Sequence, residues 1–272
     1  MNLKRKILFT IRILLLLSYL LVFNQLLFCL GEIRVTTWCG YSTVAMDDVN
    51  KQLEMKANYM FEKSGGFSPS IKKFSNGLIL GVDVLYKIST DIYLGPRIAF
   101  LFSSGEVSGK TTVWGYTQLH PPYDPVFGAK IIVNTFFMPI MFGISYSKEV
   151  KKHIFFGSKL FSGYGKANVT SHFEWYKESG YQESTCVDLY GEGIGFMFES
   201  SIFGEYRFSS NFSAVIELGY KIAKISSIKQ TNEIFYVGKT EEIVIKFEDD
   251  QGNKIPFDFS GINFTLGLKY RF

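Results

Sequence analysis

The feature that most constrains this chain is a strict two-residue alternation at its C-terminal end. One alternating set is entirely apolar and comprises Ile262, Phe264, Leu266, Leu268, Tyr270 and Phe272. The other set is polar or glycine and comprises Gly261, Asn263, Thr265, Gly267, Lys269 and Arg271. Because successive side chains of a strand point to opposite faces, the pattern predicts a strand with one apolar face and one polar or small face. A strand of a soluble sandwich also alternates, but its polar face meets bulk water and seldom collects several glycines.

Similar alternation recurs along the rest of the chain. It predicts strands at Arg34–Thr43, Leu78–Ile88, Ile92–Phe102, Phe136–Tyr146, Ile154–Lys166, Ile194–Phe208 and Phe212–Ile222. The 27 Phe and 16 Tyr, against only 7 Pro, also favour strands over disorder. With the C-terminal segment, the count is about eight strands of roughly ten or more residues, a length that crosses the ~25 Å apolar band of an outer membrane when the strand is tilted.

The connections between these strands alternate between short and long. The short ones are Ser89–Asp91, Ser147–Lys152 and Ser209–Ser210, and the long ones are about Ala45–Ser75, Ser103–Lys130, Ala167–Tyr190 and Ser226–Ser260. Bacterial barrels have short periplasmic turns and long extracellular loops. The sequence therefore predicts an all-β, antiparallel, up-and-down transmembrane β-barrel of about eight strands, with both ends of the mature chain in the periplasm.

Two of the long connections show local patterns. Asp47–Phe61 has a helical spacing of apolar residues, which predicts a short cap at the mouth of the barrel. Glu241–Phe247 alternates and predicts a hairpin that extends the wall above the membrane. If that hairpin entered the membrane, the strand count would be ten.

The N-terminal residues 1–31 have the features of a secretory signal peptide. The basic run Lys4–Lys6 precedes the apolar run Ile13–Phe23, and the small residues Cys29 and Gly31 fit cleavage before Glu32. We therefore expect a cleaved leader at 1–31 and a barrel domain at 32–272; the alternative is an uncleaved membrane anchor. The formal charge of +4 equals the four cations of the leader, so the mature chain is about neutral. It therefore has no excess of basic residues that would indicate nucleic-acid binding.

The predicted faces assign roles to charged and aromatic residues. The inward charges are Asp83, Arg97, Lys159, Glu199, Glu205, Arg207, Glu217, Lys221, Lys269 and Arg271. An eight-stranded barrel is just wide enough to be filled by side chains, so we expect a paired network in the lumen, with Glu217 and Lys269 as one candidate pair. The alternatives are a narrow gated ion path or a small binding site. On the apolar face, interface aromatics are predicted near the periplasmic ends of strands at Tyr86, Tyr146, Tyr206 and Tyr270.

The sequence offers little enzymatic chemistry. Outer-membrane lipases and acylases need a nucleophile with a positioned histidine. His120 and His172 are predicted in loops and His153 beside a periplasmic turn, and none has a serine at a telling spacing. The sequence shows no metal-ligand cluster, phosphate loop or G-x-S-x-G. We therefore predict that the protein is not an enzyme and has no cofactor and no metal.

Together these features resemble the small outer-membrane barrels typified by the OmpA transmembrane domain and OmpX, over residues 32–272. The sharpest part of the resemblance is the terminal Leu268-Lys269-Tyr270-Arg271-Phe272, with Leu268, Tyr270 and Phe272 as the assembly signal. Unlike OmpA, no peptidoglycan-binding domain is expected after the last strand, and the loops are longer than those of OmpX.

The resemblance implies an outer-membrane location in a Gram-negative cell envelope. The implied partners are outer-membrane lipid, the barrel assembly machinery, periplasmic chaperones and an extracellular ligand of unknown identity. The expected function is a non-enzymatic barrel whose exposed loops serve surface interaction or envelope integrity. The alternatives are an outer-membrane lipid-modifying enzyme or a narrow porin-like channel.

Overall fold

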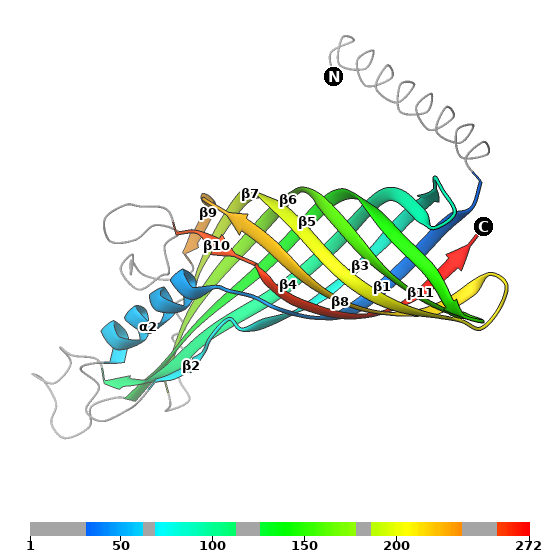
Figure 1. Cartoon of the computed structure of the whole chain (residues 1–272). Coiled ribbons are helices and arrows are strands. Elements are labelled where there is room, and N and C mark those ends of the chain that lie inside the picture. The colour runs from blue at the N-terminus through cyan, green and yellow to red at the C-terminus, as the bar shows by residue number, and fades with distance from the viewer. Residues whose placement is uncertain (1–30, 62–68, 113–125, 178–185, 236–254) are drawn as a thin grey trace, which may run out of the picture.

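The computed structural model describes residues 31–61, 69–112, 126–177, 186–235 and 255–272. Eight antiparallel strands close into a ring in the order β1-β3-β4-β5-β6-β7-β8-β11, and β11 pairs with β1 to complete it. Their bounds are β1 Ile33–Thr43, β3 Asn76–Lys87, β4 Ile92–Thr112, β5 Val126–Lys151, β6 Ile154–Lys177, β7 Cys186–Arg207, β8 Phe212–Ile225 and β11 Gly261–Arg271. The predicted antiparallel barrel of eight strands is confirmed, because each strand pairs with its neighbours in the chain and the last strand pairs with the first (Figure 1).

The alternation in the sequence becomes an inside and an outside. Along β8, exposed and buried side chains alternate without a break from Phe212 to Ile225. The outer face carries exposed large apolar side chains on every strand of the ring, among them Tyr41, Leu78, Phe102, Ile140, Phe156, Ile202, Leu218 and Leu266. The apolar side chains thus lie outside, and the buried positions hold Asp, Glu, Lys and Arg. This distribution is the reverse of that in a soluble protein, and it gives the apolar surface that contact with lipid requires.

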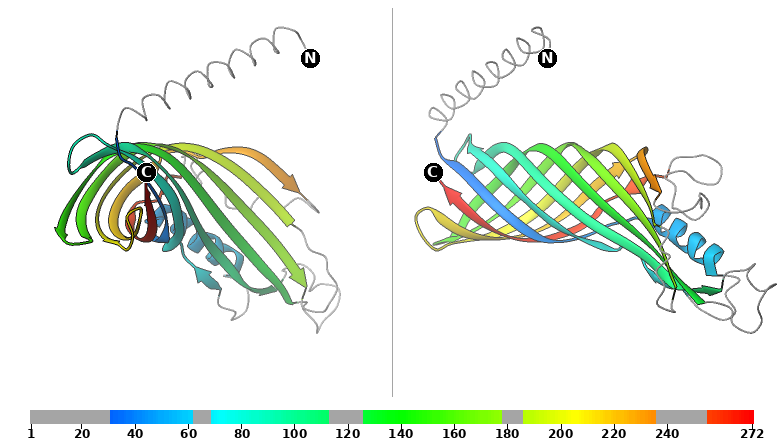
Figure 2. Two further views of the ribbon diagram at one scale, coloured as in Figure 1. Left: turned by 90° about the vertical axis from the view of Figure 1, so that its right-hand side faces the viewer. Right: turned by 180° about the vertical axis from the view of Figure 1, so that it is seen from behind.

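The two ends of the barrel differ, and we name them by their connections. The turn end holds the β3–β4, β5–β6 and β7–β8 turns together with the start of β1 and the C-terminus (Figure 2). The β5–β6 turn is shorter than predicted, because β5 continues to Lys151 and β6 begins at Ile154. His153 takes a left-handed φ of 70° there, a conformation common in two-residue turns. The loop end is the opposite end, where the longer connections lie.

The strands β4 to β7 are much longer than the sequence predicted. The segments Ser103–Thr112, Val126–Lys130, Ala167–Lys177 and Cys186–Tyr190 were predicted as loop and are strand instead. Their outward positions become polar, as at Ser104, Asn134 and Lys166, so the apolar alternation that revealed the membrane strands stops there. The apolar outer run of β5, Phe136–Tyr146, rises about 25 Å at about 3.4 Å per residue and a tilt of about 45°. The rest of the strand therefore continues beyond the membrane.

Short elements complete the loop end. Helix α2 spans Asp47–Phe61, as predicted, and lies against β4 and the two-residue strand β10, Phe257–Asp258 (Figure 1). Strand β2, Ser70–Lys72, pairs with β4, and β9, Lys229–Phe235, pairs with β7. The strand β9 lies in a segment predicted as loop, whereas the hairpin predicted at Glu241–Phe247 lies outside the described residues.

Glycine allows the helix to approach the wall closely. A Cβ atom at Gly105 of β4 would lie 2.5 Å from the ring of Phe74 and 2.8 Å from Leu53 Cδ1 of α2. Leu53 and Ala57 are fully buried there, together with Val107 and Ile131 of the extended wall. The interior of the loop end is therefore a mainly apolar core, which α2 covers.

Candidate functional site in the barrel interior

The centre of the barrel holds a charged cluster built from four strands. Asp83 on β3 faces Arg97 on β4 in register, and Arg97 Nε and Nη2 lie 2.7 and 2.9 Å from Asp83 Oδ1 and Oδ2. Lys159 on β6 reaches across the lumen to Asp83 Oδ2 at 2.8 Å and to Glu217 Oε2 at 2.5 Å. Glu217 on β8 also accepts hydrogen bonds from Arg97 Nη2 at 2.9 Å and from Ser201 Oγ at 2.7 Å. All of these side chains are buried, so the charges compensate one another rather than being hydrated.

Trp38 of β1 completes the wall of this cluster. Its Nε1 donates a hydrogen bond of 2.9 Å to Asp83 Oδ1, and the Arg97 guanidinium carbon lies 5.0 Å from its ring centroid. In register, Trp38 stands between Gly81 of β3 and Gly267 of β11. A Cβ atom at Gly81 would lie 2.4 Å from the indole, so glycine provides the space for the ring. Trp38 was not selected from the sequence, although the two glycines opposite it were a usable signal.

A second group lies next to the cluster, toward the loop end. Lys221 of β8 donates to the Thr43 carbonyl at 2.9 Å, to Asn263 Oδ1 at 3.1 Å and to the Ser42 hydroxyl. Asn263 Nδ2 in turn donates to Glu199 Oε1 at 3.1 Å, and Arg97 Nη1 lies 3.0 Å from the same oxygen. We call the cluster and this second group together the central cluster. It contains three carboxylates and three cations, namely Asp83, Glu199, Glu217, Arg97, Lys159 and Lys221.

The remaining predicted interior charges lie near the turn end. Glu205 of β7 accepts from both Lys269 and Arg271 of β11. Arg207 is half-buried, and its guanidinium carbon lies 4.3 Å from the Phe155 ring centroid. Nine of the ten predicted interior charges are buried, and Arg207 is the tenth. The structure also places three charged residues here that were not selected from the sequence: Glu32, Arg34 and Lys87.

The predicted pair Glu217–Lys269 is wrong. In register, Glu217 lies opposite Thr265, and Lys269 lies opposite Ser213, four residues nearer the turn end. Glu217 therefore pairs with Arg97 and Lys159, and Lys269 pairs with Glu205. Adjacency of two strands in the chain does not fix the stagger that barrel closure imposes.

The residues of the predicted interface and assembly signal lie on the outer face at the turn end. Tyr146 and Tyr206 are exposed, whereas Tyr86 and Tyr270 are half-exposed. The Tyr270 ring centroid lies 4.8 Å from that of Phe212 and 4.6 Å from that of Phe272. Leu268 and Phe272 are 58% and 71% exposed, and the Phe272 N–H donates to the Ile33 carbonyl at 2.9 Å. Phe272 therefore takes part in barrel closure with its backbone while its ring points outward.

The predicted positions of the histidines are correct only in part. His172 was predicted in a loop but lies on β6, where its Nδ1 is 2.5 Å from Asp188 Oδ1 on β7. His153 lies at a turn, as predicted, and His120 lies outside the described residues.

Within the part of the chain that the structure describes, no group of three or more His, Cys, Asp or Glu residues could hold a metal ion. Within that same part, no helix is long and apolar enough to cross a membrane.

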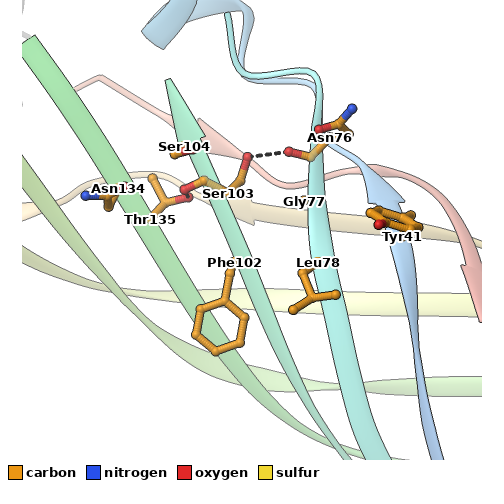
Figure 3. Close-up of a pocket in the computed structure, with 9 residues that line it drawn as sticks. All are labelled: Tyr41, Asn76, Gly77, Leu78, Phe102, Ser103, Ser104, Asn134 and Thr135. Carbon is orange, nitrogen blue, oxygen red and sulfur yellow. Dashed lines mark hydrogen bonds between the residues drawn. The ribbon is translucent and has the colours of Figure 1, made fainter. Parts of the chain in front are cut away.

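Two hollows lie on the outer face near the loop end. The first has a volume of about 460 Å³ and is lined by Tyr41, Asn76, Gly77, Leu78, Phe102, Ser103, Ser104, Asn134 and Thr135 (Figure 3). The Ser103 hydroxyl donates to the Asn76 carbonyl at 2.8 Å within it. The second, of about 580 Å³, is lined by Lys166, Glu192, Gly193, Ile194, Ser227 and Lys229. In both, apolar and polar side chains meet at the height where the outer apolar belt ends.

Of the three comparisons with known proteins, only the one with solved structures gives matches. No protein-family model matches the sequence, and no curated protein matches it significantly. The solved structures that resemble it include the attachment invasion locus protein Ail of Yersinia pestis, with 15% identity over 89% of this chain and 99% of that chain and a TM-score of 0.35. The outer membrane protein OprG of Pseudomonas aeruginosa has 10% identity, 89% and 96% coverage and a TM-score of 0.35. The outer membrane protease OmpT of Escherichia coli has 12% identity, 89% and 97% coverage and a TM-score of 0.27.

Proposed function

We propose that the protein is a non-enzymatic barrel of the outer membrane that carries its function on the wall beyond the membrane, with a lumen closed to solutes. The observation that carries the proposal is the burial of charged and apolar side chains inside the barrel. A charge-balanced cluster occupies the centre, and the apolar core beneath α2 occupies the loop end. If the lumen is closed, a partner must bind the outside of the barrel, and the extended strands β4 to β7 offer a polar surface for this.

Outer-membrane lipid is the first partner that we propose. The belt of exposed apolar side chains supports this, as do the two hollows where the belt meets polar residues. Membranes washed with carbonate or with high salt should retain the protein, because closed backbone pairing and an apolar belt hold it in the bilayer. Release into the soluble fraction would contradict the membrane assignment.

The closed lumen has a direct electrical test. In planar lipid bilayers the purified barrel should give no sustained current if the lumen is closed. The central ion pairs and the buried, stacked rings of Phe137 and Phe259 above them support this expectation. Stable openings of uniform conductance in the unmodified protein would favour the channel alternative.

The surface role requires the loop end to face outward. In a background with Cys39→Ser and Cys186→Ser, a cysteine at the exposed Asn168 of the extended β6 should react with a membrane-impermeant maleimide on intact cells. A cysteine at the exposed Ser210 in the β7–β8 turn is the matched control and should react only after the outer membrane is opened. The opposite pattern would invert the orientation.

Export and assembly complete the proposal. We propose that the leader 1–31 is removed before Glu32, and that periplasmic chaperones and the barrel assembly machinery deliver the chain, with Leu268, Tyr270 and Phe272 as the recognised residues. The position of these side chains on the outer face of the last strand supports this, because a recognition signal must be accessible before the barrel closes. N-terminal sequencing of the protein from the outer membrane should begin at Glu32.

A further inference from the structure

Three arginines line the inner wall at the turn end, and we call them the arginine mouth: Arg34, Arg207 and Arg271. Arg34 of β1 and Arg271 of β11 lie directly opposite each other in register. The guanidinium carbons of Arg207 and Arg271 lie 4.3 and 5.2 Å from the same ring centroid, that of Phe155. The Arg34 guanidinium carbon lies 3.7 Å from the Tyr93 ring centroid. Two aromatic rings therefore hold three cations side by side.

The charges here are not balanced, unlike those of the central cluster. The inward cations of this end are Arg34, Lys87, Arg207, Lys269 and Arg271, and the carboxylates paired with them are Glu32 and Glu205. Like charges placed directly opposite each other on neighbouring strands destabilise a sheet. Among these inward side chains, the five cations exceed the two carboxylates by three.

Several donors of the arginine mouth have no acceptor among the described residues. Arg34 Nη1, Arg207 Nε, and both Nε and Nη1 of Arg271 are buried without a hydrogen-bond partner. Arg34 and Arg271 are themselves only 5% and 6% exposed. Glu32 Oε1 lies 3.8 Å from Arg271 Nε, which is too far for a hydrogen bond. A buried donor left unsatisfied is costly, so an acceptor placed among these groups would stabilise them.

We propose that the arginine mouth binds a phosphate group. Guanidinium forks match the geometry of an oxyanion, and a phosphate offers several acceptor oxygens to donors that converge from three strands. A doubly charged phosphate would also offset most of the positive excess. The proposed orientation turns this end toward the periplasm, so the group is either free inorganic phosphate or the headgroup of a phospholipid in the inner leaflet.

Phosphorus NMR of inorganic phosphate, titrated with the barrel purified in a phosphate-free detergent, tests the site. The resonance should shift saturably, and Arg34→Gln and Arg271→Gln should each weaken the affinity by about tenfold. Because these two arginines also pair with carboxylates, Arg207→Gln is the variant least able to disturb the fold, and it should weaken binding as well. Lys152→Gln, an exposed turn residue at the same end, is the control and should bind as the unmodified protein does.

A second titration separates the two sources of phosphate. If phosphatidylglycerol in mixed micelles displaces inorganic phosphate while the same detergent without lipid does not, the ligand is a lipid headgroup. If it does not displace inorganic phosphate, the ligand is the free anion. Absence of saturable binding to the unmodified protein would overturn the proposal. An affinity unchanged in the folded Arg207→Gln and Arg271→Gln variants would do the same.

Discussion

Arg97 holds Asp83 by two parallel hydrogen bonds across the β3–β4 hairpin, and both side chains are completely enclosed in the barrel. A bidentate pair of this kind fixes orientation as well as charge. Because Lys159 and Glu217 attach to the same pair from the far wall, the hairpin is joined to β6 and β8 through the lumen. The central cluster thus connects strands that share no backbone hydrogen bonds.

Replacing Glu217 with leucine should destabilise the barrel by about 3–5 kcal/mol, because Arg97 and Lys159 would lose a buried counter-charge. Urea unfolding of the protein in detergent measures the loss. Glu192→Gln is the matched control, since Glu192 pairs with Lys166 on the exposed surface at 2.7 Å and such pairs contribute about 0–1 kcal/mol. Equal unfolding of Glu217→Leu and the unmodified protein would mean that position 217 is solvated.

Glu32 should give the barrel a pH-dependent contribution to stability. Burial by itself would raise the pKa of Glu32, but hydrogen bonds from Arg34 and Lys87 and their charges outweigh it and hold the pKa below its ordinary value of 4.5. A carboxyl with a lowered pKa stabilises the fold above its unfolded pKa, and this contribution is lost as the pH falls through the folded value.

The variant Glu32→Gln tests this expectation. It should be less stable than the unmodified protein by about 0.5–1 kcal/mol at pH 7, because a partly exposed pair is screened by solvent. The two proteins should converge in stability as the pH falls below about 4. Thermal unfolding of both proteins at pH 7 and below about pH 4 provides the comparison. If the difference in stability between them grew as the pH fell, Glu32 would have a raised pKa instead of a lowered one.

The cap formed by α2 should depend on Leu53. This side chain is fully buried against the wall beside Gly105, so Leu53→Ala should cost about 2–5 kcal/mol of local packing. Amide hydrogen exchange within Asp47–Phe61 should accelerate while exchange in the membrane strands stays unchanged, since the helix can open without the ring. Met55→Ala on the exposed face of the helix should leave exchange as it is. Uniform acceleration over the whole barrel would show that cap and ring unfold together.

Deleting Phe272 should reduce the amount of assembled protein in the outer membrane and leave protease-sensitive chains in the periplasm. The deletion removes a backbone hydrogen bond to Ile33 at the seam where the barrel closes, and with it the outward terminal ring. Phe208→Ala removes another exposed aromatic ring from the same end of the barrel, away from the seam, and should assemble normally. Equal assembly of the truncated and full-length chains would remove the C-terminal strand as the assembly signal.

The sequence alone determined the ring and its two faces. A period of two residues assigns each side chain to lipid or lumen, so the alternation by itself placed Asp83 in the interior and Phe264 on the outer face. A short turn also fixes the register of its hairpin. The in-register pair of Asp83 and Arg97 follows from the predicted turn at Ser89–Asp91. The predicted turn Ser209–Ser210 would have placed Glu199 opposite Tyr220. The turn in the structure is one residue longer, because the Phe208 N–H donates to the Phe212 carbonyl, and it places Glu199 opposite Lys221.

Only the tertiary structure decided which charges meet across the lumen and how far the walls rise. Contacts such as Lys159 with Asp83, or Arg34 beside Arg271, depend on the stagger of closure, a property of the complete ring that no single strand encodes. The extended walls stayed hidden for a different reason. Beyond the membrane the outer face of β4 to β7 turns polar, so strand and loop have similar compositions there, and pairing with a neighbouring strand distinguishes them.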